Sequence, residues 1–102
     1  IEHAEEDIEI RLVIEARNEA RQVLEACEKS QNHDEYIKLA DEEKQKIEDS
    51  ITKLHSTMKG QDYQIIRDSL DELNEATHHL AELIFNAVTA KALKNKRVRE
   101  IQ

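Results

Sequence analysis

Ser56-Thr57-Met58-Lys59-Gly60-Gln61-Asp62-Tyr63 is the stretch that decides how this chain folds, because it contains the only glycine of the sequence. Glycine readily adopts the left-handed conformation that closes a helix at its C′ position, and Lys59 would add a favourable positive charge to the last turn. Asp62 is suited to cap the N-terminus of a following helix. We therefore predict that Gly60 and Asp62 form the corner of an antiparallel helical hairpin.

On either side of this corner the sequence offers little that would interrupt a helix. It has 102 residues with one glycine and no proline, and these are the two residue types that end helices most strongly. This length corresponds to one small domain. Aromatic residues make up 3% of the chain and tryptophan is absent, so we expect a thin, aliphatic core.

The charge of the chain is negative overall and unevenly distributed. Residues 1–60 hold 16 acids and 9 bases, residues 61–90 hold 6 acids and 1 base, and residues 91–102 hold 1 acid and 5 bases. A net charge of −8 disfavours nucleic acid as a partner. The basic end suits the C-terminus of a helix, which attracts cations, and a patch for an anionic partner is the alternative.

Apolar residues recur at intervals of three and four along three segments, which predicts helices over about 1–30, 41–59 and 63–94. The first stripe is Ile1, Ala4, Ile8, Leu12, Ala16, Ala20, Val23 and Cys27, widened by Ile10, Val13, Ile14 and Leu24. The second is Ile47, Ile51, Leu54 and Met58. The third is Ile66, Leu70, Leu73, Thr77, Leu80, Ile84, Ala87 and Val88.

The pattern lapses over residues 30–40, where polar, cap-forming residues cluster before an acidic first turn at Asp41. Within this break, Glu35-Tyr36-Ile37-Lys38-Leu39 is expected to form a short turn of helix. We predict an all-α domain over 1–102, in which a long N-terminal helix runs into a small antiparallel three-helix bundle. A first helix of roughly 45 Å is too long for such a bundle to cover. Its N-terminal half should project or dock on a missing partner, or pair with a second copy in a dimer. Asn95 and Lys96 are expected to end the last helix.

No constellation for catalysis or metal binding stands out. Glu75 and His78 have Glu-x-x-His spacing, but a di-iron bundle needs two such motifs and two further carboxylates. A solvated polar face is the favoured interpretation, and adventitious metal binding by these residues with His79 and Glu82 is the alternative. Cys27 lies on the apolar stripe and is expected to be a small buried hydrophobe, with its thiol pKa raised by Glu25 and Glu28. We expect no enzymatic activity, cofactor or metal in this segment.

The lone cysteine cannot form an internal disulfide, which favours a reducing, cytoplasmic compartment. No apolar run approaches the ~20 residues that span a membrane, and no signal peptide is visible. The sequence opens at Ile1 inside a helical pattern, so we expect it to be a piece of a longer protein.

The order and spacing of several motifs resemble a known chaperone family. Ala16-Arg17-Asn18-Glu19-Ala20 with Val23-Leu24-Glu25 is similar to the long lid helix of the DnaK-type seventy-kilodalton heat-shock chaperones. Leu39-Ala40-Asp41 through Ile47-Glu48, Lys59-Gly60-Gln61-Asp62, Ile65-Ile66 and Leu70-Asp71-Glu72-Leu73 resemble the helices that follow it. The short end, from Ala90-Lys91-Ala92-Leu93-Lys94 to Val98-Arg99-Glu100-Ile101, looks most like the HscA branch, which serves iron–sulfur cluster assembly.

The resemblance implies a helical lid that closes over a peptide held by the protein's own β-sandwich. An upstream ATPase domain, using ATP or ADP with magnesium, would control it. A J-type co-chaperone and a client such as an iron–sulfur scaffold protein would be partners. By position, Asp7 resembles a carboxylate that latches the lid, with Glu6 and Arg11 as neighbours. The alternative is a stand-alone helical adaptor or oligomerisation module, which the apolar stripe of the last helix also supports.

Overall fold

The fold was analysed in a computed structural model, which describes the backbone of residues 2–101 and the side chains of residues 7–93. The helices are α1 (Glu2–Gln31), α2 (Asp34–Ile37), α3 (Asp41–Thr57) and α4 (Tyr63–Ile101). No strand occurs in the described backbone. The predicted all-α class is confirmed.

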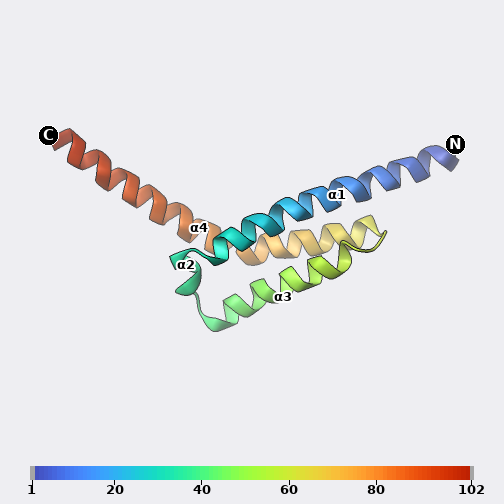
Figure 1. The fold of residues 1–102 in the computed structure, drawn as a ribbon, viewed down its shortest axis with the longest axis horizontal. Helices are drawn as coiled ribbons and strands as arrows, with labels where there is room; N and C mark the ends of the chain where they lie inside the picture. Colours follow the sequence, from blue (N-terminus) through green and yellow to red (C-terminus); the bar gives the residue numbers. More distant parts are fainter. Residues whose placement is uncertain (1, 102) are drawn as a thin grey trace.

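The chain reverses direction between α1 and α3 and again between α3 and α4 (Figure 1). The first part of α4 packs against both α1 and α3, whereas its later part leads away from them (Figure 1). The molecule is consequently elongated, with principal extents of 68 × 32 × 16 Å. The described residues form four helices, and the small antiparallel three-helix bundle stays a prediction.

Two connected clusters of buried side chains form the core. The larger cluster joins α1, α3 and α4, and the smaller one lies around α2, α3 and the middle of α4. The buried members of the larger cluster are Val13, Ala16, Ala20, Cys27, Leu54, Ile66, Leu70 and Leu73. Those of the smaller cluster are Tyr36, Leu39, Ile47 and Leu80. All three predicted apolar stripes contribute to these clusters, which explains why the segments pack together.

The end of the last helix differs from the expected one, whereas a short helix forms where a short turn of helix was expected. The helix α4 continues to Ile101 instead of ending at Asn95 and Lys96. The residues beyond Ala90 contain neither glycine nor proline and are rich in Lys and Arg, which favour helices. The short helix α2 forms inside the predicted break, where His33 acts as its N-cap and Nδ1 accepts a hydrogen bond from the Glu35 N–H at 3.1 Å.

Candidate functional site

The backbone conformation at the corner between α3 and α4 differs from the one predicted from the presence of Gly60. Gly60 does not adopt a positive φ, so the left-handed C′ conformation expected for it is wrong. The Met58 N–H donates to the Leu54 carbonyl at 2.9 Å, and the Gly60 N–H donates to the Thr57 carbonyl at 3.0 Å. These bonds tighten the end of α3 in right-handed turns. Lys59 lies beyond the last turn of the helix and is exposed.

Asp62 begins the next helix from the other side of the corner. Its Oδ1 accepts hydrogen bonds from the Gln64 N–H at 3.0 Å and the Ile65 N–H at 3.2 Å, while its carbonyl accepts one from the Ile66 N–H at 3.1 Å. These N–H groups would otherwise lack partners at the start of α4. Asp62 is therefore the N-cap of α4.

Arg17, in the middle of α1, joins the long helix to this corner. Its Nε donates to the Met58 carbonyl at 2.9 Å, and its Nη2 donates to the Gly60 carbonyl at 2.6 Å. The acceptors follow the C-terminus of α3, where carbonyl groups lack intrahelical partners and carry partial negative charge. The Arg17 guanidinium on α1 thus supplies hydrogen-bond donors to carbonyl groups at the C-terminal end of α3. Sequence reasoning missed this contact.

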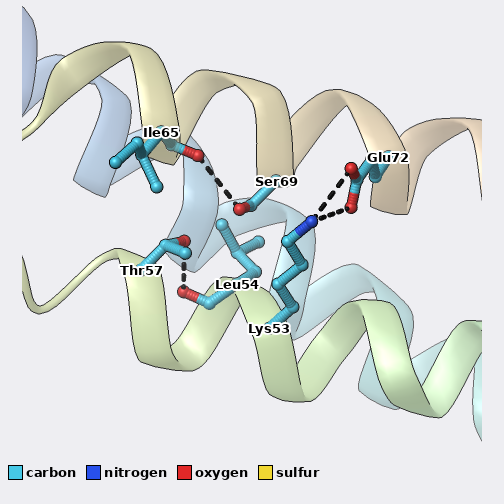
Figure 2. Close-up of polar contacts among 6 residues, drawn as sticks. All are labelled: Lys53, Leu54, Thr57, Ile65, Ser69 and Glu72. Atoms are coloured by element: carbon cyan, nitrogen blue, oxygen red, sulfur yellow. Dashed lines mark hydrogen bonds and ion pairs between the residues drawn. The ribbon is translucent and has the colours of Figure 1, made fainter.

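Ion pairs add further ties between the helices. Arg67 of α4 hydrogen-bonds Glu19 of α1 through Nη1, and its Nη2 lies 3.1 Å from Oδ1 of Asp71. The hydrogen bond to Glu19 is the main cause that raises the pKa of Arg67, so this side chain stays charged. On the opposite side, Lys53 of α3 reaches both carboxylate oxygens of Glu72 on α4, at 3.0 and 2.9 Å (Figure 2).

The interface between α3 and α4 near the Lys53–Glu72 pair contains buried side chains. Leu54 is fully buried, and Ser69 is almost so (Figure 2). The Ser69 hydroxyl donates to the Ile65 carbonyl at 3.0 Å, so its polar atom is satisfied inside its own helix. A small, internally bonded serine lets the two helices approach closely without leaving a buried polar group unpaired.

The N-terminal part of α1 runs past the corner as an arm (Figure 1). Along this arm Ile8, Ile10 and Ile14 are 57%, 56% and 50% exposed, whereas Val13 faces the core at 4%. An open cleft lies between the arm and the start of α4, lined by Glu9, Leu12, Val13, Gln61, Asp62, Tyr63 and Gln64. The arm thus carries apolar surface that the described part of the chain leaves uncovered.

The residues predicted to latch a lid lie on or near this arm. Asp7 and Arg11 are exposed, and no hydrogen bond or ion pair connects them to another described side chain. The side chain of Glu6 lies outside the described residues. The latch role of these residues stays a prediction.

The side chains considered for catalysis or metal binding are either buried in the core or paired with a neighbouring carboxylate. Cys27 is 6% exposed, and burial raises the pKa of its thiol, which replaces the predicted effect of Glu25 and Glu28. His79 bonds Glu43 of α3 at 2.8 Å, and His78 pairs with Glu82 at 3.0 Å. Among residues 7–93, no three His, Cys, Asp or Glu side chains group to hold a metal ion. No described helix is long and apolar enough to span a membrane.

Comparison with known proteins connects this architecture to a family. The family model described as Hsp70 protein matches residues 1–86. The chain is 34% identical over 98 residues to a chaperone protein HscA homolog from Ralstonia pickettii, which covers 96% of the chain and 16% of that relative. It is 31% identical over 101 residues to a chaperone protein HscA homolog from Tolumonas auensis, covering 99% of the chain and 16% of the relative.

The chain thus spans 16% of the length of these curated relatives. The family match extends across α1, α2, α3 and most of α4, so it includes the arm, the corner and the core. On this basis, the chain belongs to the Hsp70 family and is part of an HscA-like chaperone.

Proposed function

We propose that these helices form the lid of the peptide-binding domain of an HscA-like chaperone. The observation that carries the proposal is the arm at the N-terminal end of α1 (Figure 1), on which Ile8 and Ile10 are 57% and 56% exposed. A lid needs a stiff element to cover the peptide and a body that moves with it. The apolar face of the arm would contact the β-sandwich of the parent protein or the peptide that it holds.

In this proposal, the lid slows peptide dissociation in the ADP state and opens in the ATP state. Nucleotide and magnesium would be bound by an ATPase domain elsewhere in the parent. The single glycine of the chain is incompatible with a glycine-rich phosphate loop within these residues. We further propose cytoplasmic iron–sulfur cluster assembly as the setting, with a scaffold protein as client and a J-type co-chaperone as partner. The similarity to HscA homologs supports this assignment.

The latch is a finer part of the proposal. Exposed Asp7, with Glu6 and Arg11 nearby, would pair with charges on the β-sandwich when the lid is closed. An exposed ion pair contributes about 0.2–1 kcal/mol, which is enough to bias a lid without locking it.

A deletion experiment tests the lid function. Release of a fluorescent peptide from the full-length chaperone in ADP is compared with release from a variant that lacks residues 1–102. Faster release without this segment supports the lid. Equal release rates would contradict it and would direct attention to partner binding by the helices.

A second candidate function is self-association. Phe85, Val88 and Leu93 of α4 are exposed by 69%, 58% and 58%. Sedimentation of the chain with and without Phe85→Glu tests this alternative. A dimer that the substitution dissociates would support an oligomerisation module, whereas a monomer at all concentrations would exclude it.

A further inference from the structure

Arg17 is located at the root of the arm, where α1 leaves the helical body. Its guanidinium donates from Nε and Nη2 to the carbonyls of Met58 and Gly60, at 2.9 and 2.6 Å. Both acceptors belong to one turn, so a single planar group holds that turn at two points. These two bonds fix the orientation of α1 relative to the corner as well as its distance from it.

The neighbours of Arg17 on α1 reinforce the attachment on its other sides. Glu19, two positions later, bonds Arg67 of α4. Ala16 and Ala20 are 2% and 0% exposed, and their small side chains let α1 lie close to the core. At its root, α1 is therefore tied both to the end of α3 and to α4. On the N-terminal side of Val13, Ile8 and Ile10 are 57% and 56% exposed.

We propose that Arg17 is a positioning residue that makes the arm and the helical body move as one unit, and thereby sets how long a closed lid stays closed. This inference rests on the proposed lid function and deepens it. Without the two hydrogen bonds, α1 would tilt as one continuous helix relative to the end of α3, and its arm would move with it while α3 and α4 remained packed. The arm could then lift from the peptide without displacement of the whole body.

Other contacts hold the body together besides the Arg17 hydrogen bonds. Leu54, Leu70 and Leu73 are fully buried in the core, whereas Arg17 is half-buried. Lys53 and Glu72 hold α3 to α4 independently. Loss of Arg17 is therefore expected to change the mobility of the arm more than the stability of the bundle.

Distance measurement between the arm and the body tests this tilt of α1 directly. Genetically encoded spin labels replace Ile8 on the arm and Lys46 on α3 in the full-length chaperone, and pulsed electron resonance records the distribution of distances. Arg17→Ala is expected to broaden this distribution. The matched control is Arg21→Ala, because Arg21 lies one turn further along α1 and bonds only Asn18 of its own helix. An unchanged distribution in Arg17→Ala would overturn the proposal.

Peptide release provides the functional readout. In ADP, Arg17→Ala is expected to speed release about three- to tenfold, the factor that corresponds to one ordinary hydrogen bond. Arg17→Lys should give nearly the same acceleration, since an ammonium group lacks the planar donor pair. Arg21→Ala should leave release unchanged. Ile47→Val, which loosens the smaller core cluster away from the corner, separates this effect from general destabilisation and should also leave release unchanged.

The outcomes distinguish a failure of the lid function from a failure of the positioning role of Arg17. If removal of residues 1–102 speeds release but Arg17→Ala behaves like Arg21→Ala, the lid function holds and the role of Arg17 is overturned. If Ile47→Val speeds release as much as Arg17→Ala, bundle stability sets the rate and the positioning role is again overturned. If the deletion itself has no effect, the lid function fails.

Discussion

Gly60 is the only glycine of the sequence, but its role in the fold differs from the one that its residue type suggests. It lies in the corner, but its backbone does not use the left-handed region that only glycine adopts easily. A Cβ placed on it would approach the Thr57 carbonyl oxygen at 3.4 Å, an ordinary contact distance. The contribution of Gly60 to the fold is the carbonyl that accepts the Arg17 hydrogen bond, which any residue could supply.

This observation predicts that Gly60→Ala is tolerated. The substitution should increase the free energy of unfolding by about 0.4–1 kcal/mol at most. We expect stabilisation because alanine restricts the conformations of the unfolded chain. Urea denaturation of the chain with and without the substitution measures this difference. A loss well above 1 kcal/mol would mean that the corner requires a left-handed glycine after all.

Cys27 predicts a pH dependence of stability. Burial raises the pKa of this thiol above its ordinary value of 9.0, so the folded state retains a proton that the unfolded state loses. Stability from this group is fully present below the unfolded pKa and is lost as pH rises through the folded pKa. Between pH 8 and 10, the free energy of unfolding should fall more steeply in the wild type than in Cys27→Ala. Parallel pH profiles would contradict burial of the thiol.

At the scale of helices, α1 combines two roles along one continuous element. Its second half presents Ala16, Ala20 and Cys27 to the core, and its first half presents exposed isoleucines. With no glycine or proline in the helix, the halves are joined without a hinge. A force on the arm is therefore transmitted to the bundle.

A proline in the arm tests this mechanical continuity. Glu15→Pro removes a backbone hydrogen bond and kinks the helix, a change of ~3 kcal/mol or more in a helix interior. Glu15 is itself exposed, and among the described residues Val13 is the one buried member of the larger cluster on the arm side of the kink. Peptide release from the full-length chaperone in ADP should become faster, whereas Glu15→Ala should have no effect. Unchanged release in the proline variant would count against a rigid arm.

Local signals in the sequence explain why the helices and their buried faces could be predicted. Ile47, Leu54, Ile66 and Leu70 recur at helical spacing and are all fully buried. Asp62 has the side chain that an N-cap needs, and it makes the corresponding bonds.

Contacts between distant residues were not predictable in the same way. Arg17 is separated by more than forty positions from its acceptors, and those acceptors are backbone carbonyls that every residue has. His79 likewise pairs with Glu43 across two helices, although Glu75 and Glu82 are its nearer acidic neighbours in the sequence. Such partners follow from how helices are placed side by side, which periodicity does not specify.

At the scale of the molecule, the described part of the chain is a packed centre with a projecting element at each end (Figure 1). Its length of 68 Å is more than twice its second dimension. Both of the long helices carry exposed apolar side chains, Ile8, Ile10 and Ile14 on α1 and Phe85, Val88 and Leu93 on α4. This shape suits a part that covers a neighbouring domain, and the family match connects it to chaperones.

The movement of the arm relative to a bound peptide is the most direct test of the lid function. A genetically encoded fluorescent donor at position 15, on the exposed side of the arm, and an acceptor on the bound peptide report their separation in the full-length chaperone. The account predicts a short distance in ADP that lengthens when ATP binds, before the peptide dissociates. A distance that is the same in both nucleotide states would contradict the proposal that these helices open and close over the peptide.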